Sequence, residues 1–220
     1  MDDVAQLLSQ AVLFSSFDEA ALGRVAAGCR TVRLERNQVI FTEGAAAEEL
    51  FVVQSGRIAV GVRSPDGRES LVALFERGDL FGDMPLFDQG ERSASARALE
   101  RSTLLGIPYS LVRAALDETP QLLWEVVSLL AQRLRSTDTA LADAVFLDVT
   151  GRTAKRLLEL AGDADEFVLP ITQEELAGLV GASRERVNKA LAAFVRLGWI
   201  DQVDRRYRIV ERDRLAQRAR

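Results

Sequence analysis

The chain has 220 residues, 48% of them apolar and 28% charged, which argues against disorder and allows one or two domains of ~100–200 residues. Its one cysteine cannot form an intrachain disulfide, and without histidine it lacks the usual haem ligand and the most common catalytic base. We expect no metal, haem or iron–sulfur cluster, although these residue counts alone leave a Mg²⁺ or carboxylate site, or an enzyme built on Ser, Lys, Asp or Glu, possible. The net charge of −5 is uneven: residues 1–149 carry 14 basic and 22 acidic side chains, whereas residues 150–220 carry 14 and 11, which predicts two domains with different partners.

The first half of the chain predicts short helices followed by antiparallel β-structure. Residues 4–10 and 18–28 carry apolar side chains at helical spacing. Between Thr31 and Ile107, short apolar runs alternate with turn residues about every 8–12 positions, which favours a sandwich or barrel. The expected strands are 31–34, 39–41, 50–53, 58–62, 71–75 and 103–107, and Pro65-Asp66-Gly67 is expected to form a hairpin turn.

Pro120 opens a long predicted helix with a narrow apolar seam. Spacings of four and three residues alternate over about three heptads, a pattern that favours a two-stranded coiled coil, with a helix packed on its own domain as the alternative. Asp148 to Gly151 interrupts this pattern and predicts a hinge, and residues 162–166 predict an acidic loop. The seam consists of Leu123, Val127, Leu130, Leu134, Thr137, Leu141 and Ala144.

Residues 172–194 predict a helix-turn-helix. Thr172 and Glu175 have the spacing of a capping box, so a helix begins after Thr172. Gly181 supplies the left-handed conformation that ends this helix, and Ser183 caps a second one. The outer face of the second helix begins with Arg184, where recognition helices meet base edges. A final hairpin is expected at 199–210; a simple pair of helices with a charged outer face is the alternative.

These residues resemble the Crp/Fnr family of transcription regulators. Residues 173–177 and 180–189 are similar to its winged helix-turn-helix, and residues 81–94 to its cyclic nucleotide phosphate-binding cassette. Residues 133–152 are similar to its dimerisation helix and hinge. The resemblance is closest to the cyclic AMP receptor branch and implies an α+β fold. It places an antiparallel β-roll (a jelly roll) with N-terminal helices at 1–117, a dimerisation helix at 118–147 and a winged helix-turn-helix at 148–220.

A nucleotide site follows from this resemblance. Glycine allows close backbone approach and arginine offers a planar donor fork for phosphate. Asp83 stands where members that bind cyclic AMP commonly have glutamate, and Asp138 where they have serine or asparagine. By resemblance, Gly82, Asp83, Arg92 and Ser93 hold the cyclic phosphate and ribose, Arg133 and Thr137 reach in from the long helix, and Asp138 of the partner subunit faces the purine.

The resemblance also implies which residues contact DNA. Arginine can read guanine and glutamate can accept a hydrogen bond from cytosine. Lys189 replaces an arginine found in many members, and the family half-site is TGTGA-like. By resemblance, Arg184, Glu185 and Lys189 read bases, whereas Thr172, Ser183 and Arg186 contact phosphates, with Arg205 and Arg206 of the hairpin tip as further phosphate contacts.

Together these features predict a homodimeric DNA-binding regulator controlled by cyclic AMP, with RNA polymerase as a further partner. The acidic N-terminus and the lack of a long apolar run predict a cytoplasmic protein rather than a membrane or secreted one. Three alternatives are a regulator that binds DNA without cyclic nucleotide or responds to another ligand, an enzyme acting on a nucleotide, and a regulatory subunit that binds no DNA. Asp83 and Arg92 provide too few catalytic groups for the enzyme.

Overall fold

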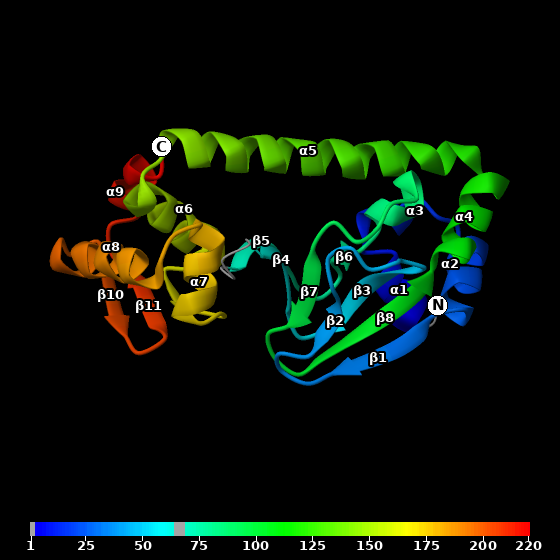
Figure 1. Cartoon of the computed structure of the whole chain (residues 1–220), viewed down its shortest axis with the longest axis horizontal. Coiled ribbons are helices and arrows are strands. Elements are labelled where there is room, and N and C mark those ends of the chain that lie inside the picture. Colours follow the sequence, from blue (N-terminus) through cyan, green and yellow to red (C-terminus); the bar gives the residue numbers. More distant parts are fainter. Residues whose placement is uncertain (1–2, 64–68) are drawn as a thin grey trace. The chain divides into compact units, whose positions relative to one another are not determined.

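The computed structural model describes residues 3–63 and 69–220, which divide into two compact units (Figure 1). Residues 3–63 and 72–134 belong to the first unit, and residues 69–71 and 135–220 to the second. The turn expected at Pro65-Asp66-Gly67 lies outside the described residues. Within the described ranges, no helix is both long and apolar enough to cross a membrane.

The first unit contains two four-stranded sheets with antiparallel pairing. The strand orders are β1-β8-β3-β6 and β2-β7-β4-β5. All six predicted strands are confirmed, whereas the short strands β6 and β7 had no clear sequence signal. The strands are β1 (Arg30–Leu34), β2 (Val39–Phe41), β3 (Glu49–Ser55), β4 (Ile58–Arg63), β5 (Glu69–Phe75), β6 (Leu80–Phe81), β7 (Ser95–Ala98) and β8 (Ser102–Pro108).

Strand β3 is buried on both faces and separates two apolar cores. Phe51 and Val53 face the core between the two sheets. Leu50 and Val52 face a second core, formed with the helices of this unit. Because successive side chains of a strand point to opposite faces, a continuous apolar run is required here rather than an alternating one. The helices are α1 (Asp3–Leu8), η1 (Val12–Phe14), α2 (Glu19–Ala27), α3 (Met84–Asp88), α4 (Tyr109–Glu118) and η2 (Pro120–Leu122).

Helix α5 (Leu123–Phe146) is the long predicted helix, preceded by the 3-10 turn at Pro120. Val126 and Leu129 are buried on one of its faces. The predicted seam lies elsewhere on the helix and is exposed, with Leu134 and Leu141 each 63% accessible. The seam therefore does not contribute to the core of this chain.

The second unit is a winged helix-turn-helix. The capping box of Thr172, the left-handed Gly181 (φ +67°) and the Ser183 cap are all present, as predicted. The predicted acidic loop is shorter than expected, because Glu166 already begins a strand, and the C-terminal helix was not predicted. The elements are α6 (Val149–Ala161), β9 (Glu166–Val168), α7 (Gln173–Val180), α8 (Arg184–Arg196), β10 (Ile200–Val203), β11 (Arg206–Ile209) and α9 (Arg212–Arg218), with sheet order β10-β11-β9.

Candidate ligand and DNA-binding sites

The cassette begins where β6 ends and the chain turns into α3. Gly82 adopts φ +75°, a conformation that disfavours other residues. A Cβ atom at this position would lie 2.6 Å from Nη1 of Arg92. Glycine is therefore needed both for the turn and for the close approach of the arginine.

Arg92 is buried and held by backbone carbonyls. Its Nη1 donates to the carbonyl of Gly82 (2.7 Å) and its Nη2 to that of Glu49 (2.7 Å). The Tyr109 hydroxyl also donates to the Gly82 carbonyl, and the guanidinium carbon lies 4.1 Å from the centre of the Phe41 ring. Burial lowers the pKa of Arg92, an effect opposed by Tyr109 and Glu49. Among the described residues, buried Nε of Arg92 has no hydrogen-bond partner, so a donor remains for a ligand.

Asp83, at the N-terminus of α3, is fully buried. Its Oδ1 lies 2.8 Å from Nη2 of Arg133, which comes from α5. Burial raises the pKa of Asp83, and the charge of Arg133 opposes this rise. Within the described part of the chain, Asp83 Oδ2 has no hydrogen-bond partner. A ligand that donates hydrogen bonds would satisfy it.

The remaining predicted ligand residues lie at the surface. Ser93 follows Arg92 directly and is exposed, with its Oγ 3.6 Å from Sδ of Met84. Thr137 and Asp138 are exposed on α5. The first unit thus brings together Gly82, Asp83, Arg92, Ser93 and Arg133.

The structure also adds residues that the sequence analysis missed. Glu49 contributes its backbone carbonyl, and such an acceptor has no signature in the sequence. Tyr109 and Phe41 position Arg92 by a hydrogen bond and by ring contact. Tyr109 could have been noticed in the sequence as an aromatic residue directly after the predicted strand 103–107.

In the second unit, the predicted base-reading residues are exposed on α8. Arg184, Glu185 and Lys189 project from its first two turns, whereas Val187 and Leu191 are buried on its inner face. Arg186 is also exposed. The amphipathic pattern of this helix therefore leaves its charged face exposed.

Two cap residues combine a structural role with an available donor. Thr172 Oγ1 accepts from the amide of Glu175 (3.2 Å), and Ser183 Oγ accepts from that of Arg186. Because a hydroxyl both donates and accepts, each can cap its helix and still donate to a phosphate oxygen.

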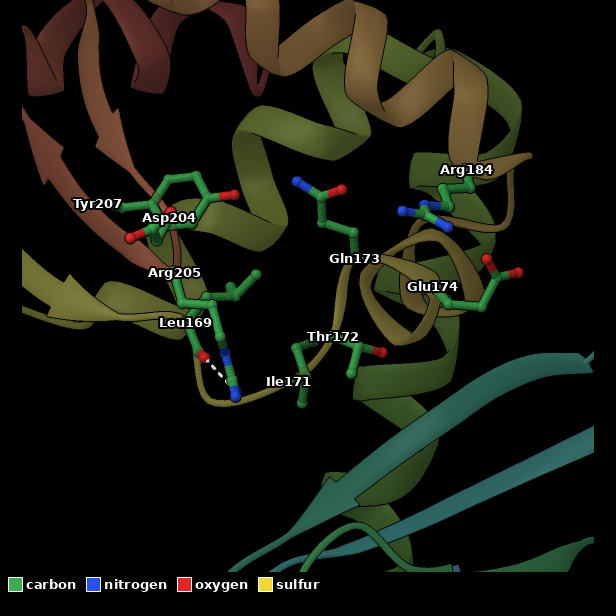
Figure 2. Close-up of a pocket in the computed structure, with 9 residues that line it drawn as sticks. All are labelled: Leu169, Ile171, Thr172, Gln173, Glu174, Arg184, Asp204, Arg205 and Tyr207. Carbon is green, nitrogen blue, oxygen red and sulfur yellow. Dashed lines mark hydrogen bonds between the residues drawn. The ribbon is translucent and has the colours of Figure 1, made fainter.

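The wing, which is the hairpin of β10 and β11, encloses with α7 a hollow of about 280 Å³, shown in Figure 2. Thr172 and Arg184 lie on one side, and Asp204 and Arg205 of the wing turn on the other. The Nη2 of Arg205 donates to the carbonyl of Leu169 (2.9 Å), which fixes this arginine at the rim. Arg206 is exposed at the first position of β11 rather than within the turn.

Comparison with known proteins identifies the families of both domains. Residues 31–119 match the cyclic nucleotide-binding domain family, and residues 151–218 match the Crp-like helix-turn-helix domain family. The chain is 37% identical over 222 residues to the CRP-like cAMP-activated global transcriptional regulator of Mycobacterium tuberculosis, covering 98% of this chain and 99% of that one.

Two further matches are named after different nucleotides, cAMP and c-di-GMP. The chain is 33% identical over 170 residues to the cAMP-activated global transcriptional regulator CRP of Salmonella typhimurium, covering 74% of this chain and 81% of that protein. The solved structure of CLP from Xanthomonas campestris, named as a c-di-GMP responsive global regulator, is 25% identical with a TM-score of 0.76, covering 87% of this chain and 99% of that one. The chain therefore belongs to the Crp/Fnr family of DNA-binding transcription regulators.

Proposed function

We propose that this protein is a homodimeric, sequence-specific transcription regulator whose affinity for DNA is controlled by cyclic AMP. The observation that carries the proposal is the pair of buried polar atoms in the cassette, Nε of Arg92 and Oδ2 of Asp83. Among the described residues neither has a hydrogen-bond partner, and buried polar groups are rarely left in this state. A ligand with an anionic oxygen beside a hydroxyl group satisfies both.

A cyclic nucleotide has this combination of groups. Its phosphate oxygens would accept from Arg92 and Ser93, and its ribose hydroxyl would donate to Asp83. Arg133 forms an ion pair with Asp83, so a nucleotide that binds Asp83 would also act on Arg133. Thr137 and the Asp138 of the second copy would contact the purine. Asp138 can accept a hydrogen bond from the 6-amino group of adenine, whereas guanine carries an oxygen at this position. The protein binds this nucleotide as an effector and does not transform it.

The exposed seam of α5 supports a homodimer. Leu134 and Leu141 are each 63% exposed, and Leu123, Val127 and Leu130 are 48%, 52% and 41% exposed. Heptad spacing of apolar residues is typical of helices that pair with a second helix. We place this seam against the same seam of a second copy, with Thr137 within the interface.

The charged face of α8 is assigned to the major groove. Arg184, Glu185 and Lys189 would read bases of a TGTGA-like half-site, and the two copies would occupy grooves ~34 Å apart. Thr172, Ser183 and Arg186 would contact phosphates, as would Arg205 and Arg206 of the wing. Bound in this way in the cytoplasm, the dimer would contact RNA polymerase.

A second candidate is a regulator that binds DNA without cyclic nucleotide or responds to another ligand. It is favoured by the contacts that already engage both cassette charges: Arg92 with two carbonyls, and Asp83 with Arg133. The relative from Xanthomonas is named as a c-di-GMP responsive regulator, which supports a response to another ligand as the second candidate.

One pair of measurements separates the two candidates. Duplexes are selected from a random pool by the purified protein, with and without cyclic AMP, and their affinities are measured at fixed salt. Calorimetry with cyclic AMP, cyclic GMP and c-di-GMP identifies the ligand. We expect cyclic AMP to bind and to raise DNA affinity. Equal DNA affinity in both conditions supports the second candidate, and binding of no duplex contradicts both.

A further inference from the structure

The C-terminal helix α9 is anchored at both ends to helix α6. At its beginning, Arg212 donates from Nη1 to the carbonyl of Gly162 (2.8 Å) and from Nη2 to that of Ala164 (2.7 Å), just beyond the end of α6. At its end, Nη2 of Arg218 forms an ion pair with Oδ2 of Asp148, directly before α6. Helix α9 therefore runs antiparallel to α6.

The carboxylate of Asp148 makes two contacts at once. Its Oδ1 accepts from the amide of Gly151 (2.8 Å) and so caps α6, while its Oδ2 holds Arg218. The hydrogen bond from Gly151 and the charge of Arg218 both lower the pKa of Asp148. One side chain thus connects the first turn of α6 to the last turn of α9.

Close backbone packing reinforces this connection. A Cβ atom at buried Gly151 would lie 3.0 Å from the carbonyl oxygen of Arg218 and 3.4 Å from Cβ of Leu147. Leu215, in the middle of α9, is fully buried. The C-terminal helix is therefore an integral part of this unit and packs directly on the segment that the sequence predicts to be a hinge.

Other contacts tie α6 to the end of α5. Nζ of Lys155 lies 2.6 Å from Oδ2 of Asp143, which is on α5, and both side chains are largely buried. Nη1 of Arg152 donates to the carbonyl of Leu147 (2.6 Å), in the linker between the two helices. The linker, residues 147–148, is thus held by contacts from α6 at Leu147 and from α9 at Asp148.

We infer that α9 is a brace for this linker, and that Arg218 is a positioning residue for DNA recognition. Through Asp148, it fixes the direction in which α6, and with it the helix-turn-helix, leaves the end of α5. The inference rests on the proposed function, because in a dimer this direction sets the separation of the two recognition helices. Without the brace, the linker samples more directions, so the dimer accepts operators with other spacings.

The test compares two operators that differ in spacing alone. The first is a palindromic duplex selected by the wild-type protein, and the second has one extra base pair at its centre, which shifts the half-sites by ~3.4 Å and about one tenth of a helical turn. The quantity measured is the affinity for the first operator divided by the affinity for the second. Arg218→Ala should lower this ratio by about two- to fivefold, the range of a partly exposed ion pair.

Matched variants separate positioning from stability. Arg214→Ala removes the same charge from an exposed position of the same helix and should leave the ratio at its wild-type value. Arg218→Glu, which repels Asp148, should lower the ratio further than Arg218→Ala, and Arg218→Lys should restore most of it. A variant that only destabilises the fold weakens binding to both operators equally. An unchanged ratio in Arg218→Ala overturns the inference.

A measurement without DNA keeps the brace testable if the proposed function fails. Hydrogen exchange of the amides of residues 149–152 reports opening at the start of α6. We expect faster exchange in Arg218→Ala than in Arg214→Ala, with intact circular dichroism in both. If the wild-type protein binds no duplex, the proposed function fails and exchange alone decides on the brace. Equal exchange rates in the two variants contradict the brace.

Discussion

Asp83 and Arg92 are opposite charges buried in the same cassette, and each keeps a polar atom for which the described residues supply no hydrogen bond. Removing a charge from water is costly unless its partners are well placed. Two backbone carbonyls offset the cost of burying the charge of Arg92, and the ion pair with Arg133 offsets part of that cost for Asp83. These two buried charges therefore cost stability at the residues that we propose to bind the ligand.

Replacement of Asp83 should therefore improve stability and impair binding. In the folded protein the pKa of Asp83 is raised, so its ionised form is destabilising above that pKa and the neutral amide of Asp83→Asn is not. We expect the melting temperature of the unliganded protein to rise by ~2–4 °C, as ~1 kcal/mol would produce in a chain of this size. Calorimetry should show cyclic AMP affinity reduced ~10- to 100-fold, the range for a hydrogen bond to a charged group. A variant that melts lower than wild type argues against the buried charge as a source of instability.

Cyclic AMP affinity should also depend on pH. In the proposed complex, hydrogen bonds from the ribose would favour ionised Asp83, so the pKa of Asp83, which burial raises, would be lowered by the ligand. Binding then releases a proton, and affinity falls by up to ~10-fold per unit as the pH drops below the pKa of the free protein. Titrations over a pH series, in buffers of different ionisation enthalpy, measure both the affinity and the proton release. Asp83→Asn should have a flat profile, and a flat wild-type profile contradicts the assigned contact.

At the scale of elements, the turn between β6 and α3 depends on Gly82. Gly82→Ala places a Cβ atom in a conformation with φ +75° and 2.6 Å from Arg92 Nη1, so we expect a loss of ~1–3 kcal/mol in the free energy of unfolding and weaker nucleotide binding. Urea unfolding gives the first quantity. Gly23→Ala is the control: within the described part of the chain nothing lies within 4 Å of its added Cβ, and alanine should stabilise α2 by up to ~1 kcal/mol. Equal effects of the two substitutions would falsify the argument from conformation.

Helix α8 allows a similar comparison of two arginines. Arg184 lies at its first position and Arg196 at its last, and both are exposed. Arg184→Ala should cost ~1–3 kcal/mol of discrimination at one base pair, whereas Arg196→Ala should have little effect on the sequence preference. Binding to a set of single-base operator variants measures this directly. A loss of the same size on every duplex would indicate a phosphate contact for Arg184 instead.

For the whole molecule, the exposed seam predicts the oligomeric state. Leu141→Glu introduces a charge at an exposed seam position and should shift the protein towards monomers in sedimentation experiments, with loss of affinity for a palindrome. Thr139→Glu adds the same charge on the opposite side of α5 and should leave the dimer intact. A wild-type protein that sediments as a monomer at micromolar concentration excludes the proposed dimer.

The parts of this molecule that could be predicted from sequence are those in which residue type determines local geometry. The capping box of Thr172, the turn at Gly181 and the seam of α5 are such cases. Helix α9 escaped prediction because it is short and rich in arginine, with Leu215 as its fully buried side chain. The hydrogen bond between Arg92 and the carbonyl of Glu49 was not predictable either, because it forms only when β3 and the cassette pack together. A backbone carbonyl is present in every residue, so the sequence does not mark it as an acceptor.

If Asp83 binds the effector as proposed, its incomplete pairing would link effector supply to the lifetime of the protein in the cell. A ligand that binds the folded state and not the unfolded chain raises the free energy of unfolding as its concentration increases. Copies without nucleotide unfold more often and are exposed to proteases, so their number falls faster than that of occupied copies. The steady-state amount of the regulator would then follow the nucleotide level, in addition to the occupancy of each copy.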